Sequence, residues 1–257
     1  MDGTLSVPTP AELFGLTGRT ALVTGASSGL GVRFAEVLAA AGATVWITAR
    51  REERLVRLAE RNPVFRPFRA DVSDAADRAA LIDAIRGAGA TLDVLVNNAG
   101  TDNGAKPDEE TPEQFAGVLA TNLVAPFHLA QLAAGLGGEV SVINVSSVLG
   151  QVSAAPLGSA SYAGSKAGLI GLTRELAGHW GRRGVRVNAL APGWFETEMN
   201  EGLFADERSV KWVNRNTMLG RAGQVSELDS ALLFLASPAS SYLTGQVLTV
   251  DGGWTAR

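Results

Sequence analysis

Cysteine is absent from this chain of 257 residues, and histidine occurs only twice, at His128 and His179. Without cysteine there can be no disulfide bond and no thiolate metal ligand. Two histidines are too few for a histidine-rich metal site, so alcohol oxidation at a cysteine-bound zinc ion is excluded and no metal site is expected. Both histidines fall on predicted long helices, where we interpret them as packing or surface residues.

A basic excess is also missing, because 22 Lys and Arg stand against 26 Asp and Glu and leave a net charge of −4. A broad nucleic-acid surface would need such an excess, whereas a single phosphate needs only a local basic pocket. The first residues lack the basic and apolar regions of a signal peptide. No apolar run reaches the ~18 residues of a membrane span. We therefore expect a cytoplasmic protein with neither nucleic acid nor membrane as a partner.

What the chain does contain is a regular alternation of short β-rich runs and amphipathic helical stretches. Hydrophobic residues make up 46% and charged residues 19%, as in globular proteins. The predicted strands are 20–24, 44–48, 64–70, 92–96, 140–145, 185–190 and 247–250. The predicted helices are 32–41, 51–61, 74–86, a long helix opened by Thr111 and Pro112, 162–180 and 226–236.

Nearly continuous apolar strands that alternate with helices indicate an α/β fold with a parallel sheet covered on both faces. Right-handed crossovers then give a single-domain, Rossmann-like, doubly wound sheet over residues 18–257. Residues 1–17 are predicted to be an irregular leader, and residues at about 195–218 a small helical lid.

A glycine-rich turn follows the first predicted strand and opens a helix. Residues 24–31 read TGASSGLG, with the spacing G-x-x-x-G-x-G and not the standard dinucleotide spacing G-x-G-x-x-G. Glycines let the backbone approach a pyrophosphate, which the amides of a helix N-terminus then bind. The turn therefore predicts a dinucleotide site, although a plain strand-to-helix turn would look similar.

The choice of coenzyme is read at the end of the second strand, where an acidic residue binds a ribose hydroxyl and an Arg binds a 2′-phosphate. Residues 48–51 read TARR and contain no carboxylate. Arg50 can clamp a phosphate bidentately, and Ser27 could add a hydroxyl. We therefore expect NADP(H) over NAD(H). The alternative is that Arg50 and Arg51 are solvated charges at the start of a helix.

Tyr162 and Lys166 lie four residues apart in a predicted helix, so both side chains share one helical face. A phenol loses its proton only near pH 10, which is too high for acid–base chemistry at neutral pH. A neighbouring ammonium favours the phenolate, so Lys166 is expected to lower the pKa of Tyr162. An ordinary pair of surface residues would have the same spacing.

Taken in order, the motifs resemble those of the classical short-chain dehydrogenases/reductases over essentially everything after the leader. The elements are residues 24–31, 71–72 (DV), 97–100 (NNAG), Asn122, 146–147 (SS), Tyr162 with Lys166, and 192–193 (PG). The resemblance implies a Rossmann-type fold, a nicotinamide coenzyme and an active site of Asn, Ser, Tyr and Lys. The two ends of the chain resemble gluconate 5-dehydrogenase-like members, and similar endings occur in 3-oxoacyl-carrier-protein-reductase-like ones.

The resemblance also implies roles for the catalytic residues. Tyr162 is the general acid in reduction and the base in alcohol oxidation, and Lys166 tunes it and holds ribose hydroxyls. Ser147, favoured over Ser146 because it directly precedes the V-x-G element, binds the substrate oxygen. Asn122 is expected to hold a water that links Lys166 to solvent.

Further positions are implied to hold the coenzyme. Asp71 and Val72 are expected at the adenine, and Phe195 and Thr197 at the nicotinamide carboxamide, while Asn97 is interpreted as a structural tie. The full predicted set is Gly25, Ser27, Ser28, Gly29, Leu30, Gly31, Arg50, Asp71, Val72, Asn98, Ala99, Gly100, Tyr162, Lys166, Pro192, Gly193, Phe195 and Thr197.

Specificity is expected to depend on two segments. The spacing from Ser147 to Tyr162 is about two residues longer than is usual for the family, so residues 151–160 are predicted to be a modified loop over the substrate. Residues 199–217 mix apolar and charged side chains, as a substrate lid does, and an ordinary pair of helices is the alternative. Trp194 is expected either to line the substrate pocket or to pack against this segment.

The principal hypothesis is an NADP(H)-dependent carbonyl reductase or alcohol dehydrogenase that acts on a small-molecule ketone or secondary alcohol. The alternatives are a catalytically silent nucleotide-binding regulator, an NAD-dependent sugar or polyol dehydrogenase, and an epimerase or dehydratase. The short segment after Pro192 leaves little room for the extra domain of the last class. By analogy with the family we expect a homotetramer or homodimer, paired through helices around 112–135 and 161–180 and through the C-terminal segment 243–254.

Overall fold

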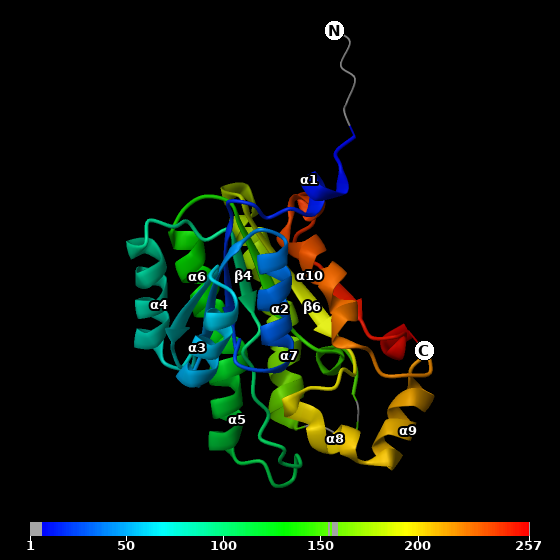
Figure 1. The fold of residues 1–257 in the computed structure, drawn as a ribbon. Coiled ribbons are helices and arrows are strands. Elements are labelled where there is room, and N and C mark those ends of the chain that lie inside the picture. Colours follow the sequence, from blue (N-terminus) through cyan, green and yellow to red (C-terminus); the bar gives the residue numbers. More distant parts are fainter. Residues whose placement is uncertain (1–6, 154, 156–158, 257) are drawn as a thin grey trace.

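The computed structural model describes residues 7–153, 155 and 159–256 of the chain. Within them, seven parallel strands form one sheet in the order β3-β2-β1-β4-β5-β6-β7 (Figure 1). The strands are β1 (Thr20–Thr24), β2 (Thr44–Ala49), β3 (Phe65–Arg69), β4 (Val94–Asn97), β5 (Val140–Val145), β6 (Val185–Pro192) and β7 (Val247–Val250). The predicted parallel, doubly wound fold is confirmed.

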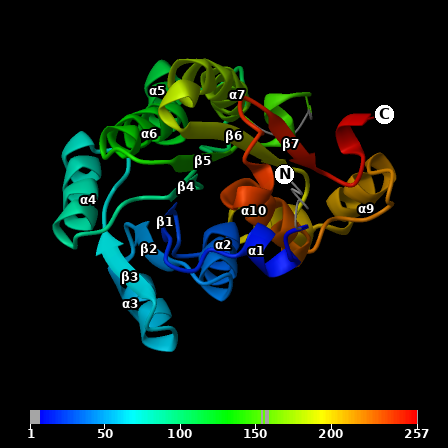
Figure 2. The same ribbon diagram turned by 90° about the horizontal axis from the view of Figure 1, so that it is seen from above.

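Helices cover both faces of this sheet (Figure 2). One face carries α2 (Gly29–Ala40), α3 (Glu52–Arg61) and α10 (Asp229–Ala236), with the short α1 (Pro10–Phe14) beside them. The other face carries α4 (Ala75–Gly87), a continuous helix made of α5 (Pro112–Leu119), η1 (Ala120–Val124) and α6 (Ala125–Gly135), and α7 (Ala160–Trp180).

Each face has its own hydrophobic core, because the central strands β1, β4 and β5 are buried along their whole length between the two layers of helices. Phe34, Leu55 and Leu232 from α2, α3 and α10 are fully buried in one core. Leu81 and Leu129 from α4 and α6 are fully buried in the other.

The strand order reverses at β1, whose neighbours are β2 on one side and β4 on the other. In sheets of this kind a crevice opens at the carboxyl ends of the strands, where the connections diverge to opposite faces. The glycine turn 25–31 follows β1, and residues 98–100 follow β4. The fold therefore brings the two predicted motifs to the same edge of the sheet.

The predicted lid is helical and lies at that edge. It consists of η4 (Glu198–Asn200), α8 (Glu201–Ala205) and α9 (Glu207–Asn216), and α9 lies near the C-terminal tail in Figure 1. The remaining short elements are η2 (Val148–Gly150), η3 (Gly181–Arg183), η5 (Val225–Leu228), η6 (Pro238–Ser240) and η7 (Trp254–Ala256). Residues 154 and 156–158 of the predicted loop 151–160 lie outside the described residues.

Local capping explains where the structure departs from the predicted boundaries. The leader is not wholly irregular, because Thr9 and Glu12 form a reciprocal capping box that starts α1 at Pro10. Ser226 does not cap the helix after the lid. A capping box between Gln224 and Glu227 starts η5, and α10 follows it.

The continuous helix Pro112–Gly135 is long and apolar enough to meet the length and composition test for a membrane span. From the sequence we expected no apolar run long enough to span a membrane, and this helix departs from that expectation. One third of the tested window is buried within the chain. A single helix of this kind is weak support for a span, since core helices meet the same test.

Candidate active site

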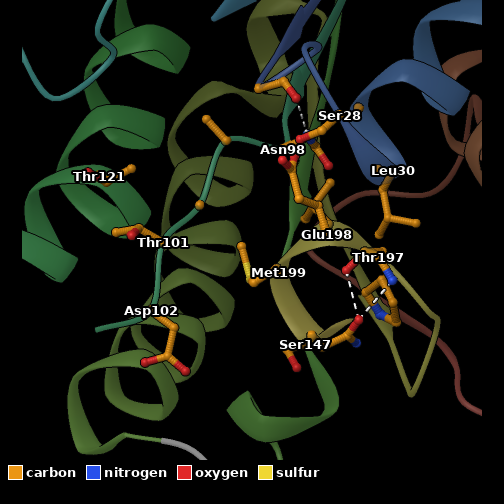
Figure 3. A pocket seen from close by; sticks show the side chains of 18 of the residues that line it. Ser28, Leu30, Asn98, Thr101, Asp102, Thr121, Ser147, Thr197, Glu198 and Met199 are labelled. Atoms are coloured by element: carbon orange, nitrogen blue, oxygen red, sulfur yellow. Dashed lines mark hydrogen bonds between the residues drawn. The ribbon is translucent and has the colours of Figure 1, made fainter. Parts of the chain in front are cut away.

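A cavity of about 660 Å³ opens at the carboxyl edge of the sheet, within the usual size range of ligand pockets. Every predicted coenzyme-binding residue lines it, and so does Ser147. Two ends can be distinguished. The glycine-loop end is lined by residues 25–31, Arg50, Arg51 and 71–72, and the tryptophan end by Thr101, Asp102, Trp194, Met199 and Leu203. In Figure 3, Ser28 and Asn98 lie away from Asp102 and Ser147.

Ser147, Tyr162 and Lys166 come together between the two ends. The Lys166 Nζ atom lies 5.5 Å from the centroid of the Tyr162 ring and donates to the Val145 carbonyl oxygen over 2.7 Å. The helix α7 supplies both side chains, and Ser159 starts this helix by accepting a hydrogen bond from the Tyr162 amide. Ser146 instead donates to the Lys166 carbonyl oxygen over 2.9 Å, so Ser147 is the serine next to Tyr162.

The acid–base properties of this pair depend mainly on burial. Burial raises the pKa of Tyr162 to about 12, a hydrogen bond with Ser147 offsets part of that rise, and the charge of Asp102 adds to it. Burial lowers the pKa of Lys166 to about 8. The prediction that Lys166 lowers the Tyr162 pKa is therefore wrong for this structure. The Lys166 ammonium lies over the face of the Tyr162 ring and donates to the Val145 carbonyl oxygen, while desolvation is the largest influence on the phenol.

Asn122 does not line the cavity but lies buried behind it. It falls in η1, a π-helical turn inside the long helix, which is a feature often found at functional positions. Its side chain accepts from the Thr101 amide over 2.8 Å and donates to the Thr101 carbonyl oxygen and to Ser165 Oγ. Asn122 thus fixes the backbone that leads from the glycine-loop end to the tryptophan end.

The glycine turn packs too closely for any side chain at two of its positions. A Cβ atom on Gly31 would lie 2.3 Å from the Gly25 carbonyl oxygen. Gly25 has a φ of +69°, and a Cβ there would lie 2.8 Å from the Ala99 Cα atom. This packing leaves the N-terminus of α2 open toward the cavity, and Ser28 at its N-cap position makes no side-chain capping bond.

Among the described residues at the glycine-loop end, Arg51 and not Arg50 forms the hydrogen bonds that connect the neighbouring side chains. Its guanidinium donates to Ser27 Oγ over 3.1 Å, to Ser28 Oγ over 2.8 Å and to Glu198 Oε1 over 3.0 Å. Arg54, one turn further along α3, also contacts Glu198 over 3.1 Å. Arg50 lines the cavity, and its charge helps to lower the pKa of Asp71. The sequence analysis treated Arg51 only as a solvated charge.

Glu198 and Asn200, both in η4, form hydrogen bonds with residues at the end of the cavity predicted to hold the coenzyme. Hydrogen bonds from Arg51, Ser28 and Arg54 lower the pKa of Glu198 to about 2, so it is a carboxylate at neutral pH. The Asn200 side chain accepts from the Thr197 amide over 2.8 Å and donates to the Phe195 carbonyl oxygen over 2.8 Å. Figure 3 shows Glu198 and Thr197 beside each other at the pocket wall.

Other predicted residues hold the frame of the glycine-loop end. Asn98 donates to the Thr24 carbonyl oxygen over 2.8 Å, and Asp71 accepts from Ser73 in a turn after β3. Asn97 lies in the sheet and donates to Asn144 Oδ1 over 2.9 Å, as a structural tie does. His128 accepts from Arg78, and His179 pairs with Glu175 on the surface.

The tryptophan end joins the lid to the C-terminal tail. Trp194, Trp212 and Trp254 meet edge to face, with ring centroids 4.9 to 5.7 Å apart. Trp194 also lines the cavity, so both expectations for this residue are met. Nothing in local sequence spacing brings these three residues together, because Trp194 follows β6, Trp212 lies on α9 and Trp254 lies in the C-terminal tail.

The residues that sequence reasoning missed are Arg51, Glu198 and Asp102. Arg51 and Arg54 are three residues apart on α3, a spacing that places them on one helical face. That spacing could have identified the pair. Glu198 and Asp102 come from segments whose positions depend on the whole fold, so only the structure reveals their partners.

The residues present fit a dinucleotide with a phosphorylated ribose. Gly25 and Gly31 leave no room for a side chain, and the open N-terminus of α2 offers amides to a pyrophosphate. Arg50 and Arg51 could hold a further phosphate. The Phe195 carbonyl oxygen and the Thr197 amide, both of which bond to the Asn200 side chain, could hold an amide.

Comparisons with known proteins give the class of the protein. A family model described as enoyl-(acyl carrier protein) reductase matches residues 25–255. The chain is 40% identical over 260 residues to a gluconate 5-dehydrogenase of Gluconobacter oxydans, covering 95% of this chain and 97% of that protein. It is 39% identical over 246 residues to a tropinone reductase homologue of Arabidopsis thaliana, covering 93% and 91%.

A solved structure is also similar over the whole fold. A gluconate 5-dehydrogenase from Burkholderia cenocepacia, in complex with NADP and tartrate, matches with a TM-score of 0.92 at 37% identity, covering 97% of this chain and 100% of that one. The chain belongs to the short-chain dehydrogenases/reductases and is an oxidoreductase of that family, which uses NAD(P)(H). The predicted family is confirmed. The names of the relatives differ in substrate, so similarity gives the class and leaves the substrate open.

Proposed function

We propose that this protein is an NADP(H)-dependent carbonyl reductase or alcohol dehydrogenase, with Asn122, Ser147, Tyr162 and Lys166 as its active site. The observation that carries the proposal is the meeting of Ser147, Tyr162 and Lys166 between the two ends of one cavity. A coenzyme in the glycine-loop end and a substrate in the tryptophan end would meet at these side chains.

Side chains of this protein would supply the proton that the substrate oxygen receives during reduction. When bound, the nicotinamide supplies or accepts the hydride. Ser147 and Tyr162 would both donate to the substrate carbonyl oxygen, and Tyr162 would pass its proton to that oxygen as the alkoxide develops. The raised pKa keeps the proton on Tyr162 at neutral pH, so its release requires the strongly basic alkoxide that develops as the hydride arrives. Lys166 is the neighbouring group that could return a proton to Tyr162, and Asn122 would hold a water on the route to solvent.

The preference for NADP(H) rests on the cations that follow β2. Arg51 and Arg50 follow the last residue of that strand, and Ser27 and Ser28 add hydroxyls beside Arg51. A guanidinium fork and hydroxyl donors suit the oxygens of a 2′-phosphate. No carboxylate stands at residues 48–51 to bind a ribose hydroxyl. The related structure with NADP is consistent with this choice.

We also propose that the protein forms a homo-oligomer through the long helix Pro112–Gly135 and α7. Phe115, Val124 and Phe127 on that helix are 38%, 50% and 39% exposed. Val124 and Phe127 lie on neighbouring turns, Phe115 lies nearer the start of the helix, and large apolar side chains exposed along one helix are typical of an interface. Pairing through them would also account for the apolar composition of this helix. Whether the assembly is a dimer or a tetramer can be measured by light scattering.

A panel of ketones and secondary alcohols, followed by NADPH or NADH absorbance, tests the proposed reaction. We expect turnover of some members with NADPH or NADP⁺, and slower turnover at the same concentration of NADH or NAD⁺. Tight NADPH binding without turnover of any member would instead indicate a silent nucleotide-binding regulator. Faster turnover with NAD⁺ would indicate an NAD-dependent sugar or polyol dehydrogenase.

A further inference from the structure

One carboxylate reaches the tryptophan end of the cavity, and the backbone holds it there. Asp102 lines the cavity directly after Thr101, whose amide and carbonyl groups are both bound by Asn122. Its Oδ1 atom accepts from Ser159 Oγ over 2.5 Å and from the Gly104 amide over 3.1 Å. Among the described residues no hydrogen bond reaches its Oδ2 atom. Asp102 is therefore positioned in the wall with acceptor capacity to spare.

Asp102 also lies close enough to Tyr162 for its charge to influence the Tyr162 hydroxyl. Its negative charge contributes to the raised pKa of Tyr162. Ser159, its hydrogen-bond partner, is the N-cap of the helix that carries Tyr162. The field of Asp102 therefore acts on any charge placed beside the Tyr162 hydroxyl.

No cation balances this carboxylate at the tryptophan end. The basic residues that line the cavity are Arg50, Arg51 and Lys166, so far as the described residues go. The two arginines belong to the glycine-loop end, and Lys166 donates to a buried carbonyl oxygen. The loop 151–160 contains no Lys or Arg in its sequence.

The segments that frame the opening are acidic as well. Residues 101–113 contain five carboxylates against Lys106 alone, and the lid 195–218 contains five against three basic residues. Those three, Arg208, Lys211 and Arg215, are exposed on α9 and do not line the cavity. The net charge of both segments is negative, so it would repel an anion that enters at this end.

We propose that Asp102 makes the site selective for uncharged, hydroxyl-bearing ketones and alcohols and disfavours carboxylate-bearing ones. The inference rests on the proposed oxidoreductase function and names its class of substrate. A hydroxyl beside the reacting carbon can donate to the carboxylate of Asp102, whereas a substrate carboxylate meets a like charge. The substrate would then differ in charge from the gluconate named in two of the similar dehydrogenases.

Matched pairs of compounds test this selectivity. Glucitol and gluconate differ only in a terminal CH₂OH or carboxylate, and butane-1,3-diol and 3-hydroxybutanoate form a shorter pair. We expect kcat/KM with NADP⁺ at low ionic strength to favour the neutral member of a pair by about tenfold or more. Added salt should reduce the ratio because it screens the repulsion. Binding can be followed independently through the intrinsic tryptophan fluorescence, to which Trp194 in the cavity wall contributes.

The variant Asp102→Asn should reduce the ratio of kcat/KM between the neutral and the carboxylate member roughly tenfold. It removes the repulsion of the substrate carboxylate and weakens the hydrogen bond from the neutral hydroxyl. Its amide oxygen can still accept from Ser159 and Gly104, so the fold should be retained, as thermal unfolding will check. Asp108→Asn removes the same charge from an exposed turn in the same segment and should leave the ratio unchanged.

Two results would overturn the inference: a wild-type preference for the carboxylate member, or a ratio that Asp102→Asn and Asp108→Asn change equally. Failure of the proposed function has a different signature. In that case no member of either pair, nor of the wider ketone panel, is turned over with either coenzyme.

Discussion

The two ends of the cavity present groups of opposite charge on different kinds of structure. The glycine-loop end presents a helix N-terminus and the guanidinium groups of Arg50 and Arg51, all of which favour an anion. The tryptophan end presents the carboxylate of Asp102 and the aromatic ring of Trp194. Local motifs build the first end, whereas segments distant in sequence build the second. Coenzyme recognition should therefore be separable from substrate recognition by mutation.

The largest effect is expected where the two ends meet. Replacing Tyr162 by Phe removes the proton donor and should lower kcat by about 10²- to 10⁴-fold. The Kd for NADPH should change little, because the phosphate-binding groups are untouched. Stopped-flow turnover and a fluorescence titration measure the two quantities. Near-normal turnover by Tyr162→Phe would show that another group supplies the proton.

The next effect concerns the glycine-loop end alone. Arg51→Ala removes donors to Ser27 and Ser28 and a cation for the 2′-phosphate, and should raise the Kd for NADPH roughly tenfold to a hundredfold. The Kd for NADH should stay nearly constant. Arg50→Ala is the matched comparison, and we expect it to have the smaller effect. A larger loss with Arg50→Ala would restore the assignment made from the sequence.

A smaller effect in the opposite direction is expected from the lid. Glu198 accepts hydrogen bonds from Arg51 and Arg54, so a 2′-phosphate at Arg51 must displace this carboxylate or lie beside it. Glu198→Gln should lower the Kd for NADPH roughly two- to fivefold, in keeping with the weak interaction of exposed ion pairs. Glu201→Gln, an exposed neighbour in α8, is the control. Weaker NADPH binding by Glu198→Gln alone would mean that the lid pair clasps the coenzyme.

The last effect concerns the free energy of unfolding, and not binding or turnover, and it is a dependence of stability on pH. Burial lowers the pKa of Lys166 from 10.5 to about 8, so between these values the unfolded chain binds the proton that the native chain has lost. Stability from this group should therefore rise with pH, by at most about 1.4 kcal/mol per pH unit. Above pH 10 the raised pKa of Tyr162 acts in the opposite direction.

Urea unfolding of the wild type and of Lys166→Met, without added coenzyme, isolates this contribution. The difference in unfolding free energy between the two should shift in favour of the wild type from pH 8 to pH 10. A constant difference over that range would mean that Lys166 keeps its ordinary pKa.

The fold and the glycine turn could be predicted from the sequence for physical reasons. Apolar strands such as 140–145 and caps such as Thr111 depend on near neighbours, and the close packing of Gly25 and Gly31 depends on a single turn. The positions of Tyr162 and Lys166 follow from helical spacing.

What the sequence could not predict depends on long-range packing. The cluster of Trp194, Trp212 and Trp254 joins three distant segments, and Glu198 meets Arg51 across 147 positions of the chain. The raised pKa of Tyr162 depends on its burial, which helical spacing alone does not give. The role proposed for Asp102 depends on the absence of a cation from the tryptophan end among the described residues that line the cavity, and this is a property of the whole cavity.

The central claim is that the glycine-loop end selects the 2′-phosphate of NADP(H). Isothermal titration of the wild-type chain with NADPH and with NADH at the same ionic strength tests it directly. We predict that NADPH binds at least about tenfold more tightly, as charge-assisted hydrogen bonds to the additional phosphate require. A Kd for NADH equal to or below that for NADPH would contradict the claim.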